Sequence, residues 1–356
     1  MKVYFRVDAS KHIGSGHVMR CLSLAESLKA KGHEIHFVMR PQEGDLCDYT
    51  DSRGFIVKRL PKIVEPKLPN NTADYEAWLQ VSLIDDAQDF LLAAPDAELI
   101  IIDHYGISLE WEKYVKSFIK CKQFAIDDLV RAHCADLILD QTYDKKAEEY
   151  LRISPFSEVL VGSKYALLNP KFSELHMASI NKSPRIENHK LLITMGGVDN
   201  MNVTLKVLSA LSRRAPKFQT TVLLNEKAPH YSSVASFCEK HNTWVKHVPF
   251  SEDMAGLMAE HTISIGAPGS TSWERACIGL PSILIPLAEN QREICKSLVV
   301  ADASISLEIA EISEFLNNKL DDLLKRYSIM RRRALNLCDG RGVERLVEKL
   351  SLIGWI

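Results

Sequence analysis

The first loop of the chain combines residue types suited to proton transfer and to close contact with a ligand. An apolar stretch over 3–7 is followed by a polar loop with Gly14 and Gly16, and His17 comes directly after the second glycine. Glycines let the backbone approach a ligand closely, and a histidine beside them could take a proton from water or a hydroxyl. A Gly-x-Gly pair alone is more often an ordinary tight turn, and a histidine there a helix cap.

The residues after this loop predict a helix that begins near His17. Apolar residues recur at helical spacing, for example at Val18, Leu22 and Ala25. In an open α/β sheet, such a strand–loop–helix unit is a common place for a ligand. The positive end of the helix dipole disfavours an imidazolium there, so we expect a neutral His17 that can accept a proton.

Polar side chains also follow three buried-type strands of the first half. They are Asp103, His104, Tyr105, Asp127, Asp128 and Asp140. Strands that alternate with helices predict a parallel sheet, whose carboxyl edge would bring these residues to the same side as His17. Aspartates at strand ends also serve as helix caps, and for Asp128 this alternative remains open.

Two loops of the second half have the pattern of phosphate-binding loops. One contains Gly196 and Gly197, and the other contains Gly269, Ser270 and Thr271. Each follows an apolar stretch and precedes a helical one, so its backbone N–H groups would lie at a helix N-terminus. Together they could hold a diphosphate without a metal, although each alone could be an ordinary turn.

Three further polar residues could complete a nucleotide-sugar site. Glu274 could accept both hydroxyls of a ribose or could simply favour the helix dipole. Asn290 and Gln291 offer amides for sugar hydroxyl or acetamido groups, or are ordinary loop residues. The Gly-x-Gly-x-x-Gly and Gly-x4-Gly-Lys-Ser/Thr patterns are absent from the sequence, which disfavours dinucleotide and P-loop sites.

The elements that must position these residues predict two α/β domains with a cleft between them. We expect a Rossmann-like domain over 1–172, a second over 186–335, and a C-terminal helix over 336–356 that could pack on the first domain. Residues 169–189 are polar and indicate a linker, and 61–72 indicate an irregular surface segment.

The composition is that of an ordinary globular protein. The 356 residues, 46% of them hydrophobic, exceed what one core usually holds. The net charge of −2 argues against binding nucleic acid by bulk electrostatics, and no apolar run reaches the roughly 18 residues of a membrane span. Eight scattered cysteines form no Cys-x-x-Cys pair, so we predict no metal site, no cofactor and a cytoplasmic location.

In chain order, these residues resemble the PseG-type UDP-sugar hydrolases of bacterial pseudaminic acid biosynthesis. The resemblance begins with Arg6-x-Asp8-x-Ser10-x-x-Ile13-Gly14-x-Gly16-His17-x-x-Arg20-Cys21. It continues through Trp78-Leu79-x-Val81-Ser82, Ile102-Asp103-His104-Tyr105, Asp127-Asp128, Gly196-Gly197-x-Asp199, Gly269-Ser270-Thr271-Ser272-Trp273-Glu274-Arg275 and Asn290-Gln291. The second half is also similar to the UDP-binding half of MurG.

The resemblance implies a GT-B fold and hydrolysis of UDP-2,4-diacetamido-2,4,6-trideoxy-β-L-altropyranose to UDP and the free sugar. It implies inverting attack at the anomeric carbon by water that His17 activates, without a metal. Asn290 and Gln291 match the family's positions for the substrate sugar. The implied substrate-binding residues are Arg6, Asp8, Gly14, Gly16, Tyr105, Asn290 and Gln291. The implied UDP-binding residues are Gly196, Gly197, Gly269, Ser270, Thr271 and Glu274.

The chain departs from the family pattern at two positions. Pro268 stands where the family has a glycine and removes one N–H donor, and Asp140 stands where an amide is expected. Two other functions stay open: a GT-B glycosyltransferase, in which His17 would activate an acceptor hydroxyl, and a non-catalytic protein that binds a UDP-sugar.

Overall fold

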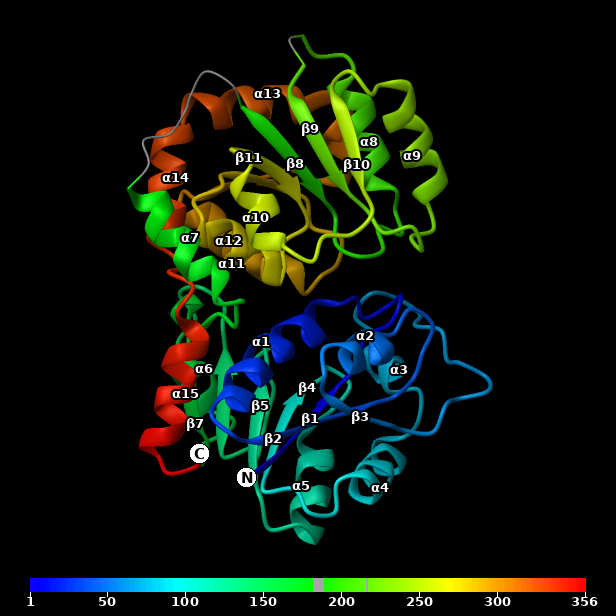
Figure 1. Cartoon of the computed structure of the whole chain (residues 1–356), viewed down its shortest axis with the longest axis vertical. Coiled ribbons are helices and arrows are strands. Elements are labelled where there is room, and N and C mark those ends of the chain that lie inside the picture. The colour runs from blue at the N-terminus through cyan, green and yellow to red at the C-terminus, as the bar shows by residue number, and fades with distance from the viewer. Residues whose placement is uncertain (182–188, 216) are drawn as a thin grey trace. The chain divides into compact units, whose positions relative to one another are not determined.

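The computed structural model describes residues 1–181, 189–215 and 217–356 (Figure 1). The chain divides into two compact units. Unit 1 comprises Met1–Leu168 and Arg341–Ile356, and unit 2 comprises Asn169–Gly340. Each unit has a parallel sheet with helices on its faces, so the predicted class of two Rossmann-like units is confirmed.

Within the described residues, unit 1 has a seven-stranded parallel sheet in the order β3-β2-β1-β4-β5-β6-β7. The strands are β1 (Lys2–Val7), β2 (Glu34–Met39), β3 (Ile56–Arg59), β4 (Leu99–Asp103), β5 (Lys122–Ile126), β6 (Leu137–Asp140) and β7 (Glu158–Val161). The helices are α1 (Gly16–Ala30), α2 (Cys47–Ser52), α3 (Tyr75–Leu79), α4 (Leu83–Ala93), α5 (Leu109–Phe118), α6 (Ala147–Leu151), η1 (Ser163–Tyr165) and α15 (Gly342–Leu352).

The strand order of unit 1 reverses at the pair β1 and β4. Strand β1 leads to β2 on one side, whereas β4 leads to β5 on the other. Val7 and Asp103 are register partners at the carboxyl ends of these two strands. Ligands of open α/β sheets bind at such a switch point, and here the loop after β1 leaves the sheet beside the residues that follow β4.

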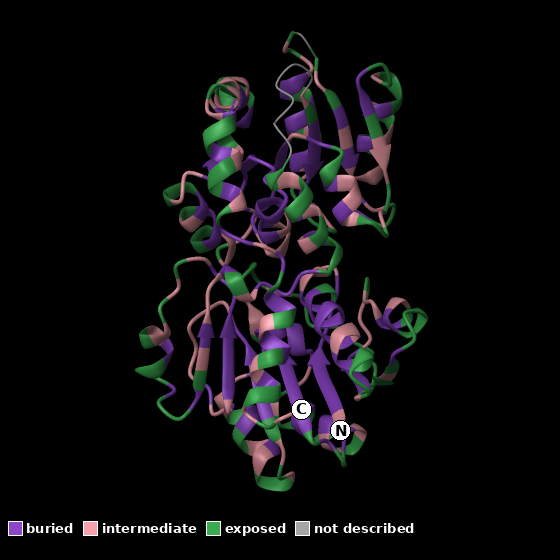
Figure 2. Ribbon diagram, turned by 60° about the vertical axis from the view of Figure 1, so that its left-hand side comes forward, coloured by how far each residue is buried: buried purple, intermediate pink, exposed green. Residues whose placement is uncertain are grey.

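Both faces of this sheet are covered, which explains its nearly continuous apolar strands. Figure 2 shows the strands buried over most of their length. Alternate residues of β1, such as Phe5, pack with α1 and α15 on one face, whereas Tyr4 packs with α4 and α5 on the other. Helix α15, from the end of the chain, contacts α1 within unit 1.

Within the described residues, unit 2 has a six-stranded parallel sheet in the order β10-β9-β8-β11-β12-β13. The strands are β8 (Lys190–Thr194), β9 (Gln219–Leu223), β10 (Val245–Val248), β11 (Ile263–Gly266), β12 (Ser282–Leu284) and β13 (Ser304–Ser306). The helices are α7 (Lys171–Ile180), α8 (Val203–Leu211), α9 (Tyr231–Lys240), α10 (Met254–Ala259), α11 (Ser270–Cys277), α12 (Gln291–Val300), η2 (Ile309–Glu311), α13 (Ile312–Lys325) and α14 (Tyr327–Leu335).

The predicted linker over 169–189 is wrong in its first part, because α7 occupies much of it. Phe172 is buried, and a ring nitrogen of His176 lies 2.6 Å from the carbonyl oxygen of Cys277. This packing on unit 2 outweighs the polar composition that indicated a loop. Residues 182–188 of the predicted linker lie outside the described residues.

Candidate active site

His17 contacts an aspartate at the end of strand β4. It is the second residue of α1, and its Nδ1 lies 2.6 Å from Oδ1 of Asp103 at the end of β4. Asp103 is fully buried, whereas 11% of the His17 side chain is exposed. A carboxylate only accepts hydrogen bonds, so Nδ1 carries a proton, and in the neutral ring Nε2 is then the acceptor. This is the arrangement of a histidine oriented to take a proton from a bound water or hydroxyl.

Arg20 fixes the charge of Asp103. It lies one turn after His17 on α1 and donates Nε to Oδ2 at 2.6 Å and Nη2 to Oδ1 at 2.7 Å. Burial alone would raise the pKa of Asp103, but the Arg20 guanidinium and His17 hold that pKa well below its usual range. Asp103 is therefore a carboxylate at neutral pH.

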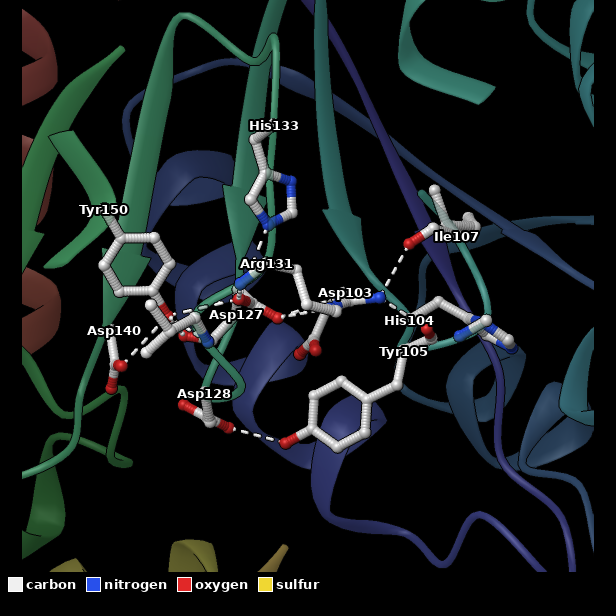
Figure 3. A network of polar contacts seen from close by, with 12 residues as sticks. Asp103, His104, Tyr105, Ile107, Asp127, Asp128, Arg131, His133, Asp140 and Tyr150 are labelled. Atoms are coloured by element: carbon white, nitrogen blue, oxygen red, sulfur yellow. Dashed lines mark hydrogen bonds and ion pairs between the residues drawn. The ribbon is translucent and has the colours of Figure 1, made fainter. Parts of the chain in front are cut away.

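Tyr105 and Asp128 join the same network (Figure 3). The Tyr105 hydroxyl donates to Oδ2 of Asp128 at 2.8 Å, and Arg20 Nη1 donates to the same oxygen at 2.7 Å. The ring of Tyr105 meets the imidazole of His17 edge-on, with 4.6 Å between centroids. The structure thus brings together His17, Asp103, Tyr105 and Asp128, which the sequence places at one sheet edge.

Asp127 belongs to a second network at this edge, which Arg131 connects to the backbone carbonyl of Tyr105. It accepts hydrogen bonds from the backbone N–H and the Nε of Arg131, at 3.0 and 2.8 Å. His133 lies between Asp127 and Glu112, with Nδ1 2.6 Å from Glu112. Burial would lower the pKa of His133, but these two carboxylates raise it to about 9. Arg131 also donates to the carbonyl of Ile107, so this network fixes the loops that follow β4 and β5.

Asp140 lies with Asp127 around the hydroxyl group of Tyr150. The Tyr150 oxygen lies 3.0 Å from Oδ2 of Asp140 and 3.1 Å from Oδ2 of Asp127, and it accepts the N–H of Val130 (Figure 3). One hydroxyl hydrogen cannot serve both carboxyl groups. Burial and the charge of Asp128 raise the pKa of Asp140 to about 7. Below a pH of about 7, a protonated Asp140 can donate to the Tyr150 oxygen while the Tyr150 hydroxyl donates to Asp127.

Arg6 and Asp8, which are predicted to bind the substrate, lie inside unit 1. Neither side chain has exposed surface. Arg6 donates to Asp8 at 2.7 Å and to both oxygens of Asp86 at 3.0 and 2.7 Å. Asp8 also accepts the backbone N–H of Arg40 at 2.7 Å. These pairs anchor the end of β1 and the start of the His17 loop, and a direct contact with substrate stays a prediction.

The two glycines before His17 shape the loop. Gly14 has a φ of +80°, a conformation that side chains rarely adopt, and its N–H donates to the carbonyl of Ser10 at 2.8 Å. The Ser10 hydroxyl accepts the N–H groups of His12 and Ile13, each at 3.2 Å. Gly16 is the first residue of α1. Hydrogen bonds within the loop therefore fix its shape, and His17 lies in the first turn of α1.

In the first predicted phosphate loop of unit 2, an aspartate side chain accepts two backbone N–H groups at the start of α8. Gly196, with a φ of +83°, and Gly197 are exposed after β8. However, the Asp199 carboxylate accepts the N–H groups of Val203 and Thr204, each at 2.8 Å. Asp199 therefore caps two N–H groups at the start of α8, and the binding of a phosphate by this loop stays a prediction. The N–H groups of Gly196 and Gly197 remain as candidate donors.

The second predicted phosphate loop leads directly into α11. Gly269 precedes the helix, and Ser270 and Thr271 are its first, partly exposed residues. The Gly269 N–H donates to the hydroxyl of Ser272 at 3.2 Å. Hydroxyl and backbone donors of Ser270 and Thr271 thus lie at a helix start, where an anion is favoured.

Glu274 and Arg275 carry buried polar atoms one turn further along α11. Among the described residues, Oε2 of Glu274 has no hydrogen-bond partner although it is buried. Burial raises the pKa of Glu274 to about 7, against the opposing charge of Arg275. Arg275 donates to the carbonyl of Ala267 at 2.8 Å. An unpaired buried carboxyl oxygen of this kind is unfavourable unless a ligand pairs with it.

Asn290 and Gln291 mark the start of α12 in unit 2. Asn290 is the residue before the helix, and Oε1 of Gln291 accepts the N–H of Leu287 at 2.8 Å. This bond connects Gln291 to the backbone of its own loop, and contact of either residue with a sugar stays a prediction. The structure places these two residues, Glu274 and both predicted phosphate loops in unit 2, and His17 in unit 1.

The sequence reasoning assigned no role to Arg20, which binds both Asp103 and Asp128. Arg20 lies three residues after His17 on a helix, a spacing that places both side chains on one face. This spacing could have identified Arg20 from the sequence.

In the part of the chain that the structure describes, no group of three or more histidine, cysteine or acidic residues could hold a metal. No helix of the described ranges combines the length and apolar character needed to cross a membrane.

Comparison with known proteins defines the class of the fold. Residues 191–336 match the Glycosyltransferase family 28 C-terminal domain. The structure is similar to that of MurG from Acinetobacter baumannii, with a TM-score of 0.67 at 14% identity over 98% of this chain and 99% of that chain. The chain thus has the GT-B fold, and its residues 191–336 match a family 28 C-terminal domain.

Two relatives align over most of the chain. The UDP-2,4-diacetamido-2,4,6-trideoxy-beta-L-altropyranose hydrolase of Campylobacter jejuni is 30% identical over 265 residues, which cover 73% of this chain and 82% of that protein. The chain belongs to the family of this hydrolase. The spore coat polysaccharide biosynthesis protein SpsG of Bacillus subtilis is 22% identical over 365 residues, 99% of this chain and 98% of that protein.

Proposed function

We propose that this protein hydrolyses a UDP-linked 2,4-diacetamido-2,4,6-trideoxy sugar to UDP and the free sugar. The altropyranose derivative named in its Campylobacter jejuni relative is the proposed substrate. The observation that carries the proposal is the pairing of His17 with Asp103, because it leaves Nε2 as a proton acceptor.

In the proposed reaction, Nε2 of His17 takes a proton from water as the water attacks the anomeric carbon. Asp103 holds the ring in the required tautomer and stabilises the imidazolium that forms. The bond between the anomeric carbon and the UDP oxygen breaks, and the electron pair leaves with UDP. One base and no covalent intermediate imply inversion at that carbon.

In the same proposal, unit 2 supplies the groups that bind UDP. Backbone donors of Gly196 and Gly197 and the start of α11 at Ser270 and Thr271 would stabilise the charge of the leaving diphosphate. Glu274 would accept the ribose hydroxyls, which would pair its buried oxygen. Asn290 and Gln291 would then face the sugar.

A glycosyltransferase is the second candidate, and the family 28 C-terminal domain is the observation that favours it. In that case, His17 would take a proton from an acceptor hydroxyl instead of water. Incubation with the diacetamido UDP-sugar and no acceptor separates the two functions. We expect stoichiometric UDP and free sugar, with His17→Asn folded and nearly inactive; UDP release only with an added acceptor would establish transfer.

A further inference from the structure

We propose that Asp128 is a positioning residue for His17 and acts through Arg20 and Tyr105. The inference rests on the proposed function, in which His17 is the base. It concerns a residue that does not contact the imidazole itself but binds two side chains that surround it.

A single oxygen of Asp128 makes both connections. Oδ2 accepts Arg20 Nη1 at 2.7 Å and the Tyr105 hydroxyl at 2.8 Å. Arg20 Nη2 lies 3.3 Å from Nδ1 of His17 and also donates to Asp103, and the Tyr105 ring packs on the imidazole at 86°. Removal of this oxygen would therefore take away one contact of Arg20 and the hydrogen bond of the Tyr105 hydroxyl, the two side chains beside the imidazole.

The loop that carries Asp128 is itself held firmly. Asp128 follows β5, and only 8% of its side chain is exposed. Val130 has a φ of +55°, which a β-branched residue rarely adopts. Its N–H donates to the Tyr150 hydroxyl, and Arg131 ties the loop to Asp127. The position of Asp128 is thus set by the fold before any ligand binds.

Because Oδ1 of Asp128 makes no hydrogen bond to the described residues, asparagine and alanine at this position test different contributions of the side chain. Among the described residues, Oδ1 is buried and has no hydrogen-bond partner. In Asp128→Asn, the amide oxygen can occupy the Oδ2 position and accept both hydrogen bonds, whereas Asp128→Ala removes both. The asparagine variant therefore loses the charge and keeps the connections.

Glu112→Gln provides a matched control. Glu112 is a fully buried carboxylate of the same unit, and it accepts from Nδ1 of His133 and from the backbone of Cys134 and Ala135. Glu112 belongs to the network that fixes the loop after β5, so Glu112→Gln tests whether a general loosening of that loop lowers activity while both contacts of Asp128 are kept.

The first measurement is steady-state hydrolysis of the diacetamido UDP-sugar. We expect Asp128→Ala to lower kcat about tenfold or more with little change in KM, as a displaced catalytic group does. Asp128→Asn and Glu112→Gln should stay close to wild type. Wild-type kcat in Asp128→Ala, or an equal loss in the control, would overturn the proposal.

The second measurement is NMR of the His17 ring in the unliganded protein, which needs no substrate. Asp128→Ala should shift the ring proton signals of His17 because the Tyr105 ring is released, and Tyr105→Phe should shift them in part. Unchanged signals in both would overturn the positioning role. This holds even if the wild type hydrolyses no UDP-sugar, so the two proposals fail independently, and Tyr105→Phe replaces Asp128→Ala if the latter does not fold.

Discussion

Asp103→Asn is the substitution that most directly probes the proposed base. The Asp103 carboxylate accepts Nδ1 of His17 at 2.6 Å and two nitrogens of Arg20 at 2.6 and 2.7 Å. An amide has one acceptor oxygen, so its NH₂ group must face either Arg20 or His17. If the NH₂ group faces His17, the proton of the ring must move to Nε2, and the acceptor nitrogen that the reaction needs is lost. If the NH₂ group faces Arg20, it lies unfavourably against the guanidinium cation.

Both effects have a magnitude. The wrong tautomer should lower kcat by about 10²–10⁴-fold, as loss of a general base does, which is about 3–5 kcal/mol of transition-state stabilisation. Arg20 keeps Asp128 as a partner, so the cost to folding should be near the lower end of the range for a broken buried pair, about 3 kcal/mol.

The assay is UDP release by anion-exchange chromatography, with UDP binding and the melting temperature measured on the same samples. A double variant, His17→Asn with Asp103→Asn, should be no slower than His17→Asn alone, because residues that act as a unit are not additive. Near-normal kcat in Asp103→Asn, or multiplied losses in the double variant, would refute the pairing as the source of the base.

Three further predictions concern the binding of UDP, a buried proton and a metal. UDP should raise the melting temperature more than UMP or ADP does, by the equivalent of about 2.7 kcal/mol at a hundredfold excess over Kd. Glu274→Gln should reduce this shift, and equal shifts for the three nucleotides would count against a dedicated UDP site. The folded-state pKa of Asp140 is raised from 3.8 to about 7, so the folded protein holds a proton that the unfolded chain loses, and stability falls as pH rises between these values. The melting temperature of Asp140→Asn relative to wild type should therefore be higher at pH 8 than at pH 5, and thermal denaturation showing a constant difference would contradict the proton assignment. Turnover should survive EDTA, because backbone and hydroxyl donors are proposed to bind the diphosphate; loss of activity that Mg²⁺ restores would exclude this arrangement.

Much of the fold follows from sequence pattern, because buried parallel strands are apolar on both faces. The stretch 99–102 predicts β4, and the aspartate after it predicts the edge where Asp103 meets His17. Helix α7 was not predicted, because prolines and asparagines flank it and indicate a loop. Its packing within unit 2, which the sequence does not show, stabilises the helix.

The candidate site could be predicted less completely, because contacts between distant residues leave no local pattern. The cap that Asp199 places on α8 and the Arg20 link from Asp103 to Asp128 depend on side-chain geometry. The burial of Arg6 against Asp86, 80 residues away, likewise appears only in three dimensions.

The most direct test of the account is hydrolysis in ¹⁸O-water, because it reports which bond breaks. If water activated by His17 attacks the anomeric carbon, early mass spectra will show ¹⁸O in the released sugar and none in UDP. UDP does not exchange oxygen with solvent as a free reducing sugar does, so it is the cleaner reporter. Label in the β-phosphate of UDP would mean attack at phosphorus and would contradict the proposed mechanism.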